Sequence, residues 1–248
     1  MVPSTSLIPI HDANPTRTFS WVTAGLIAAN VLVFLTEPGL GRASAQNPAS
    51  LGFFCHFGIV PRELTNSPPS APLLCSGEPG GGYVTLFSSM FLHSGWAHLL
   101  GNMLFLWVFG NNVEDVLGRA RYVAFYLLTG LAASFAHILA NPTSDIPTVG
   151  ASGAIAGILG AYLVLFPRAR IKTIVPLFLF WLVDLPAAAV LGYWFLSQFL
   201  IGAGQQLGAG VAWMAHVGGF TSGALLMLLL RRGDLGAGGR AGPWGAPP

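Results

Sequence analysis

The sequence predicts an all-α fold: a polytopic membrane protein in which six helices form a bundle. The composition is 53% hydrophobic and only 8% charged, with a mean hydropathy of +0.65, whereas soluble domains carry roughly a quarter charged residues. Six apolar segments follow one another along the chain, and several approach the length of about twenty residues that a bilayer requires. The formal charge is only +2 and no basic run is present, so the lipid bilayer is the expected partner and nucleic acid is not.

The chain divides into an amino-terminal segment, a membrane domain and a tail. Residues 1–18 are polar and contain three prolines, and we expect a cytoplasmic segment there rather than a cleaved signal peptide. Residues 19–230 form the predicted six-helix transmembrane domain. The predicted spans are residues 19–35, 83–109, 122–139, 149–166, a part of 174–201, and 207–230. Residues 231–248 are rich in Gly and Pro, which predicts a disordered cytoplasmic tail.

The fifth apolar segment is too long for one simple span. Asp184 and Pro186 interrupt it, and proline is favoured in the first turn of a helix. We therefore expect the fifth spanning helix to start near Pro186, with residues 173–183 lying at the membrane interface.

Residues 37–82 are predicted to be a long extracytoplasmic loop, because breakers rich in Gly, Pro and Ser punctuate them. The apolar middle of this loop, residues 51–59, favours a short interfacial element. The chain's two cysteines, Cys55 and Cys75, both lie in it. In an oxidising compartment they form either a disulfide or two free thiols, and the sequence leaves both possibilities open.

The basic residues orient the six spans. With both termini in the cytoplasm, the cytoplasmic side holds nine of the eleven lysines and arginines, and only Arg42 and Arg62 lie outside. Cytoplasmic connections carry the excess of basic residues in membrane proteins. The nine are Arg17, Arg119, Arg121, Arg168, Arg170, Lys172, Arg231, Arg232 and Arg240.

This topology places a serine and a histidine at matching depth. Ser152 lies near the outer end of the fourth span and His216 near the outer end of the sixth. Serine becomes a nucleophile when a neighbouring base takes its proton, and neutral imidazole suits that task. The alternative is structural, because serine in a membrane helix often bonds back to a carbonyl one turn earlier. No acidic residue is suitably placed for a triad, so we expect a Ser152–His216 dyad.

Two further polar residues share a helix face near the outer end of the second span. His98 and Asn102 are four residues apart, and polar side chains inside a membrane usually face a bundle interior or cavity. They are candidates for stabilising an oxyanion; the alternative is that they hold helices together.

Small-residue faces on the fourth and sixth spans predict close packing between them. Gly153 and Gly157 are spaced as G-x-x-x-G, as are Gly219 and Gly223, and such faces let helix backbones approach closely. That approach would bring the Ser152 hydroxyl and the His216 ring within hydrogen-bonding distance.

Together these motifs resemble the rhomboid family of intramembrane serine proteases. The resemblance covers about residues 83–230 and rests on three short motifs in order. They are His98-x-x-x-Asn102, Gly150-x-Ser152-Gly153 and Ala215-His216-x-x-Gly219, with Phe91-Leu92-His93-x-Gly95-Trp96 before the first.

The resemblance implies a rhomboid-like six-helix bundle in a bacterial plasma membrane that cleaves transmembrane segments of substrate membrane proteins near their outer end. It implies Ser152 as nucleophile and His216 as general base. His98, Asn102 and the Ser152 backbone amide would hold the oxyanion. Gly150 would keep the turn before the serine open, and His93 would line the cavity. No metal or cofactor is implied.

Two departures and two rival functions accompany the resemblance. Some family members place an aromatic residue four positions after the serine, where this chain has Ala156, so another residue must steady the histidine ring. An aromatic–arginine pair in the long loop is not evident, which leaves its docking open. The rivals are an inactive rhomboid-like protein that binds transmembrane helices and a transporter, although no inverted repeat is evident. The sequence does not reveal the natural substrate or the oligomeric state.

Overall fold

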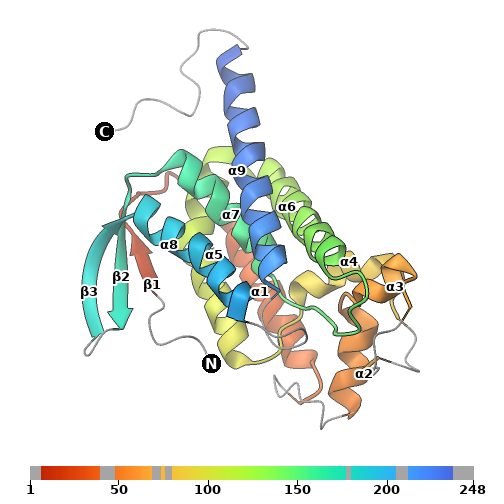
Figure 1. Cartoon of the computed structure of the whole chain (residues 1–248). Helices are drawn as coiled ribbons and strands as arrows, with labels where there is room; N and C mark the ends of the chain where they lie inside the picture. Colours follow the sequence, from red (N-terminus) through yellow and green to blue (C-terminus); the bar gives the residue numbers. More distant parts are fainter. Residues whose placement is uncertain are drawn as a thin grey trace.

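The computed structural model describes residues 7–39, 48–68, 74–75, 80–176, 180–204 and 212–236. Six long helices form a bundle beside a small sheet (Figure 1). The six are α1 (Trp21–Thr36), α5 (Trp96–Leu117), α6 (Arg119–Ala140), α7 (Ser152–Leu165), α8 (Ala187–Gly204) and α9 (Trp213–Gly236). Each overlaps one of the six predicted segments, and α8 starts directly after Pro186 as expected. Most of the predicted tail from residue 231 lies outside the described residues.

Shorter elements lie in the connections. They are α2 (Pro48–Phe57), α3 (Pro61–Thr65), η1 (Gly82–Val84), α4 (Thr85–Ser88), η2 (Ser89–Phe91), and the strands β1 (Ile8–Asp12), β2 (Arg170–Pro176) and β3 (Phe180–Pro186). The helix α2 overlaps the short element predicted for residues 51–59. By length and composition, two of the described helices suffice to cross a membrane, over Arg119–Ala140 and Trp213–Arg231. Trp21–Thr36, Ser152–Leu165 and Ala187–Leu200 are shorter apolar helices, so six spans remain a proposal.

The helix α7 is the centre of the bundle. Every residue from Gly153 to Tyr162 is buried, and α7 packs against α5, α6, α8 and α9 (Figure 1). It is apolar on all faces, which is typical of a helix that is buried all round. The first residue of α7, Ser152, is therefore held by a helix that is enclosed by its neighbours.

The prediction of a purely α fold is wrong in one region, because the chain also forms a three-stranded antiparallel sheet in the order β1-β2-β3. Residues 173–183, predicted only to lie at the interface, contribute to two of its strands, and β1 comes from residues 1–18, which were predicted to be a polar cytoplasmic segment. Ile8 pairs with Ile174, and Lys172 with Asp184. The β-branched residues of β2 favour a strand, and its partners are β1, far away in sequence, and β3, the next element along the chain.

The second predicted span was misplaced: α5 starts at Trp96 rather than Tyr83 and continues to Leu117 rather than Phe109. Gly95, with φ of 159°, precedes the helix. At the other end, Glu114, which lies beyond the predicted end of the span, is paired with the first turn of α1. The Glu114 carboxylate accepts hydrogen bonds from the backbone N–H groups of Val22 and Thr23, at 3.0 and 2.7 Å.

Asp12 at the end of β1 is anchored in the same way. Its Oδ2 accepts hydrogen bonds from Asn112 Nδ2 and the Tyr162 hydroxyl, each at 2.8 Å. Burial raises the pKa of the Asp12 carboxyl above its usual value. These contacts fasten the sheet to α5 and α7.

Candidate active site

Ser152 is the first residue of α7, where a tight turn delivers it. Gly150, two residues earlier, has a φ of 132°, a conformation that side chains other than glycine rarely adopt. A Cβ at Gly150 would also lie 2.8 Å from both Cε1 and Nε2 of His98. Because the first backbone N–H groups of a helix have no intrahelical acceptor, the Ser152 amide is a donor beside its own hydroxyl.

His216 on α9 lies directly against this hydroxyl. The distance from His216 Nε2 to Ser152 Oγ is 2.8 Å, and the histidine is only 8% exposed. The structure thus brings together the two residues that the sequence proposed as a dyad, from helices 64 positions apart.

Glycines on both helices permit this contact. A Cβ at Gly219 would collide with the carbonyl oxygen of Gly153, and a Cβ at Gly223 with that of Gly157. The two G-x-x-x-G faces therefore pack backbone to backbone, as the spacing predicted.

His98 and Asn102 lie on the first turns of α5. His98 Nδ1 accepts the Ser94 backbone N–H at 3.4 Å and lies 3.1 Å from the Ser94 hydroxyl. The proton of the neutral ring then belongs on Nε2, because a neutral imidazole has one donor and one acceptor nitrogen. A Cβ at Gly150 would lie 2.8 Å from this nitrogen and 3.6 Å from Ser152 Oγ, so the two atoms border the same space beside Gly150.

Asn102 is 8% exposed, and its Nδ2 has no hydrogen-bond partner among the described residues. Buried polar groups normally have partners, so this amide is a donor available to a bound group. His93, by contrast, is fully buried and is not among the residues that line the cavity beside Ser152. Its backbone N–H donates to the Glu37 carboxylate at 2.8 Å, and burial raises the pKa of Glu37 to about 7.

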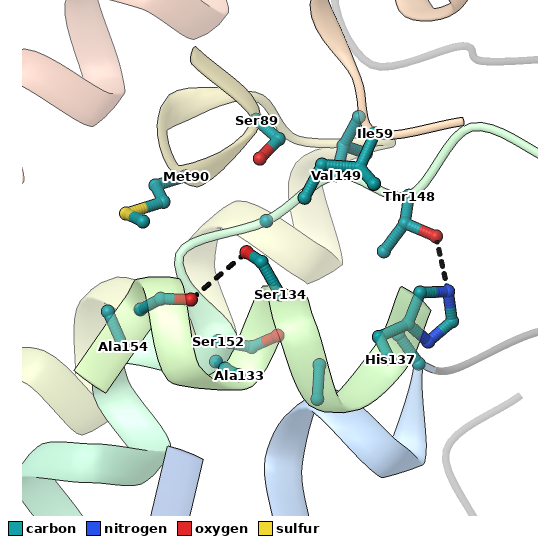
Figure 2. Close-up of a pocket in the computed structure, with 15 residues that line it drawn as sticks. Ile59, Ser89, Met90, Ala133, Ser134, His137, Thr148, Val149, Ser152 and Ala154 are labelled. Atoms are coloured by element: carbon teal, nitrogen blue, oxygen red, sulfur yellow. Dashed lines mark hydrogen bonds between the residues drawn. The ribbon is translucent and has the colours of Figure 1, made fainter. Parts of the chain in front are cut away.

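A cavity of about 30 Å³ adjoins Ser152 on the side of α6 (Figure 2). Its polar lining comes from Ser89, Ser134, His137 and Thr148, and the remainder is small or apolar. His137 Nε2 and the Thr148 hydroxyl share a hydrogen bond of 2.9 Å. A polar cavity needs roughly 10–15 Å³ of such space to hold a water molecule, so this one has room for water beside the hydroxyl.

The long loop of residues 37–82 docks onto the segment that precedes Ser152. Ile59 and Thr148 exchange two backbone hydrogen bonds, at 3.0 and 2.8 Å. Asp145 forms an ion pair with Arg62 and accepts the backbone N–H of Cys75 at 3.0 Å.

Cys55 and Cys75 form a disulfide, which settles the alternative left open by the sequence. The docking that the sequence left open is made by backbone contacts of Ile59 with Thr148 and by Asp145.

The sequence reasoning missed two residues of α8 that contact His216. The Trp194 ring centroid lies 5.6 Å from that of His216, and Gln198 Oε1 lies 2.7 Å from His216 Nδ1. Trp194 and Gln198 are therefore the residues that steady the His216 ring in this chain, where Ala156 stands four positions after the serine. Two signals were available: the residues are four apart and share a helix face, and a glutamine in an apolar helix is costly without a partner.

Comparison with known proteins agrees with this geometry. The model of the Rhomboid domain matches residues 80–233. The chain is 30% identical over 159 residues to human "Presenilin-associated rhomboid-like protein, mitochondrial", covering 63% of this chain and 36% of that protein. It is 32% identical over 151 residues to yeast "Rhomboid protein 1, mitochondrial", covering 57% and 40%.

A bacterial relative, "Rhomboid protease GluP" of Bacillus subtilis, is 41% identical over 91 residues, covering 37% of this chain and 17% of that protein. The chain spans well under half the length of these curated relatives.

Proposed function

Because the chain belongs to the rhomboid family, we propose that it is an intramembrane serine endopeptidase that cleaves transmembrane segments of membrane proteins. The hydrogen bond of 2.8 Å between Ser152 Oγ and His216 Nε2 carries this proposal. A hydroxyl paired with a buried, neutral imidazole at a helix start is the arrangement that nucleophilic acyl transfer needs.

In the proposed first step, His216 Nε2 takes the hydroxyl proton as Ser152 Oγ attacks the carbonyl carbon of the scissile peptide bond. The oxyanion accepts hydrogen bonds from the Ser152 N–H, His98 Nε2–H and Asn102 Nδ2–H. The protonated His216 then gives its proton to the leaving nitrogen, the C–N bond breaks, and an acyl ester remains on Ser152.

Water completes the proposed reaction. His216 takes a proton from a water molecule, whose oxygen attacks the ester carbonyl. Collapse of this second tetrahedral intermediate releases the carboxylic acid product and returns the proton to Ser152. The cavity beside Ser152, lined also by Ser89, Ser134, His137 and Thr148, has room for that water.

We further propose that the six long helices cross a bacterial plasma membrane with both termini in the cytoplasm. The distribution of Lys and Arg supports this orientation. Cleavage then occurs near the extracytoplasmic face. The small residues around Ser152, among them Gly153 and Ala215, suit a substrate with a small side chain at the cut.

The test is cleavage by the purified protein of a panel of single-span membrane substrates, together with labelling by a fluorophosphonate probe. We expect labelling and cleavage by the wild type, and loss of both in Ser152→Ala, with the cut position mapped by mass. His216→Ala should also abolish cleavage, because the hydroxyl then has no base.

Ser222→Ala is the matched control, because this hydroxyl of α9 bonds only to the Gly219 carbonyl among the described residues. It should behave as the wild type. A folded wild-type protein that neither reacts with the probe nor cuts any substrate would favour the inactive rhomboid-like alternative. Substrate-dependent flux in liposomes that survives His216→Ala would favour a transporter.

A further inference from the structure

We propose that Gln198 of α8 is a positioning residue of the active site, which fixes the ring of His216 and selects its reactive tautomer. Gln198 Oε1 lies 2.7 Å from His216 Nδ1, the nitrogen on the opposite side of the ring from Ser152. Both side chains are buried, with exposed fractions of 3% for Gln198 and 8% for His216. The inference rests on the proposed function and adds a residue to its machinery.

The orientation of the Gln198 amide follows from its other contacts. Gln198 Nε2 lies 3.0 Å from the Trp194 carbonyl oxygen and 3.2 Å from the Ser197 hydroxyl. A carbonyl oxygen only accepts hydrogen bonds, so the amide end beside it must be the NH₂ donor. The acceptor Oε1 therefore faces the imidazole.

This orientation determines which nitrogen of His216 carries the proton. Because Oε1 can only accept, the nitrogen beside it, Nδ1, must donate. Nε2 of the neutral ring is then unprotonated, and its lone pair faces the Ser152 hydroxyl at 2.8 Å. That is the tautomer a general base requires, set by the hydrogen bond on the other nitrogen.

An amide suits this place better than a carboxylate. A carboxylate buried in an apolar bundle carries a large desolvation cost, whereas the amide offers the same acceptor without a charge. The helix α8 also supplies Trp194, one turn before Gln198, whose ring is inclined at 38° to the imidazole. One face of α8 thus fixes both the plane and the tautomer of His216.

The first test measures the wild-type protein and needs a variant only to assign the signals. In protein labelled with ¹⁵N-histidine, the side-chain shifts of His216, assigned by their loss in His216→Ala, report which ring nitrogen is protonated. We expect the Nδ1–H tautomer, and a predominant Nε2–H tautomer would overturn the proposal. This measurement requires no activity, so it is separate from the test of the proposed function.

The second test compares Gln198→Met, which keeps length and removes the acceptor, with Gln198→Glu, which keeps an acceptor. Replacing the residue that orients a catalytic histidine has lowered the turnover of a soluble serine protease by about ten-thousand-fold. Since an amide holds the ring less strongly than a carboxylate, we expect Gln198→Met to lower kcat by roughly ten- to a hundred-fold, with little change in KM and a mixed tautomer population.

Gln198→Glu keeps an acceptor for Nδ1 at the desolvation cost that a carboxylate carries, so it should retain more activity than Gln198→Met and keep the Nδ1–H tautomer. Leu200→Met is the control on the same helix, because Leu200 is 75% exposed. It should match the wild type in kcat and melting temperature. Equal losses in Gln198→Met and Gln198→Glu would show that the amide matters only for packing and would overturn the proposal, as would wild-type kcat in Gln198→Met.

Discussion

Two histidines flank the Ser152 hydroxyl, and their partners give them opposite tautomers. The Ser94 N–H donates to His98 Nδ1, which leaves His98 Nε2 as a donor. Gln198 Oε1 accepts from His216 Nδ1, which leaves His216 Nε2 as an acceptor. One ring is therefore prepared to give a hydrogen bond and the other to take a proton. Neither role can be read from histidine alone, because each depends on the atom bonded to the far nitrogen.

Asn102 Nδ2, which has no hydrogen-bond partner within the described part of the chain, leads to a prediction about a single residue. If it donates to the oxyanion, Asn102→Ala should lower kcat by roughly ten- to a thousand-fold, the range for one lost donor, and change KM little. Steady-state cleavage of a single-span substrate measures both constants. Asn30→Ala is the control, since this buried asparagine of α1 donates to the Leu26 carbonyl. It should change stability and leave kcat near the wild-type value. A wild-type kcat in Asn102→Ala would mean that Asn102 is only structural.

At the scale of elements, the sequence predicted helix contacts and helix starts that depend on residues close together in the chain. The paired glycines predicted the close contact of α7 with α9, and Pro186 predicted the start of α8. The prediction failed where distant segments complete an element. Asn112 and Glu114 lie beyond the predicted end of the second span, and their partners, Asp12 and Thr23, lie 100 and 91 positions earlier in the chain. Gln198 was not predicted as a site residue, because its partner His216 lies on another helix.

The contact between α7 and α9 makes a prediction about Gly223. Gly223→Ala forces a methyl group against the Gly157 backbone, and overpacking of this kind costs about 1–3 kcal/mol. We expect a lower melting temperature in detergent and slower cleavage, because His216 moves with α9.

Gly192→Ala is the matched control, since a Cβ there meets nothing within 4 Å. Alanine also has the better helix propensity, so this variant should be as stable as the wild type or slightly more so. An unchanged Gly223→Ala protein would contradict the backbone-to-backbone packing.

At the scale of the whole molecule, the bundle is fastened near both ends of α7. On one side, the sheet is tied to α5 and α7 through Asp12. On the other, the outer loop is tied to the segment before α7 through Ile59, Thr148 and Asp145. The sequence identified this loop and its cysteines but not its docking, because the docking contacts join residues about 70 to 90 positions apart.

The disulfide provides a test of this fastening, because the chain has only two cysteines and a reductant can act at one bond. Closing a loop of about this length stabilises a fold by roughly 3 kcal/mol. Reduction frees the Cys75 backbone from Cys55, and Cys75 is one of the groups that hold Asp145 beside Arg62. We therefore expect a reductant to lower the melting temperature and to slow substrate cleavage.

The double variant Cys55→Ser and Cys75→Ser should start at the reduced level and show no response to reductant, which separates loss of the bond from other effects of the reagent. Cleavage at full rate after complete reduction, verified by thiol alkylation and mass, would show that the docked loop holds the segment before Ser152 without the covalent link.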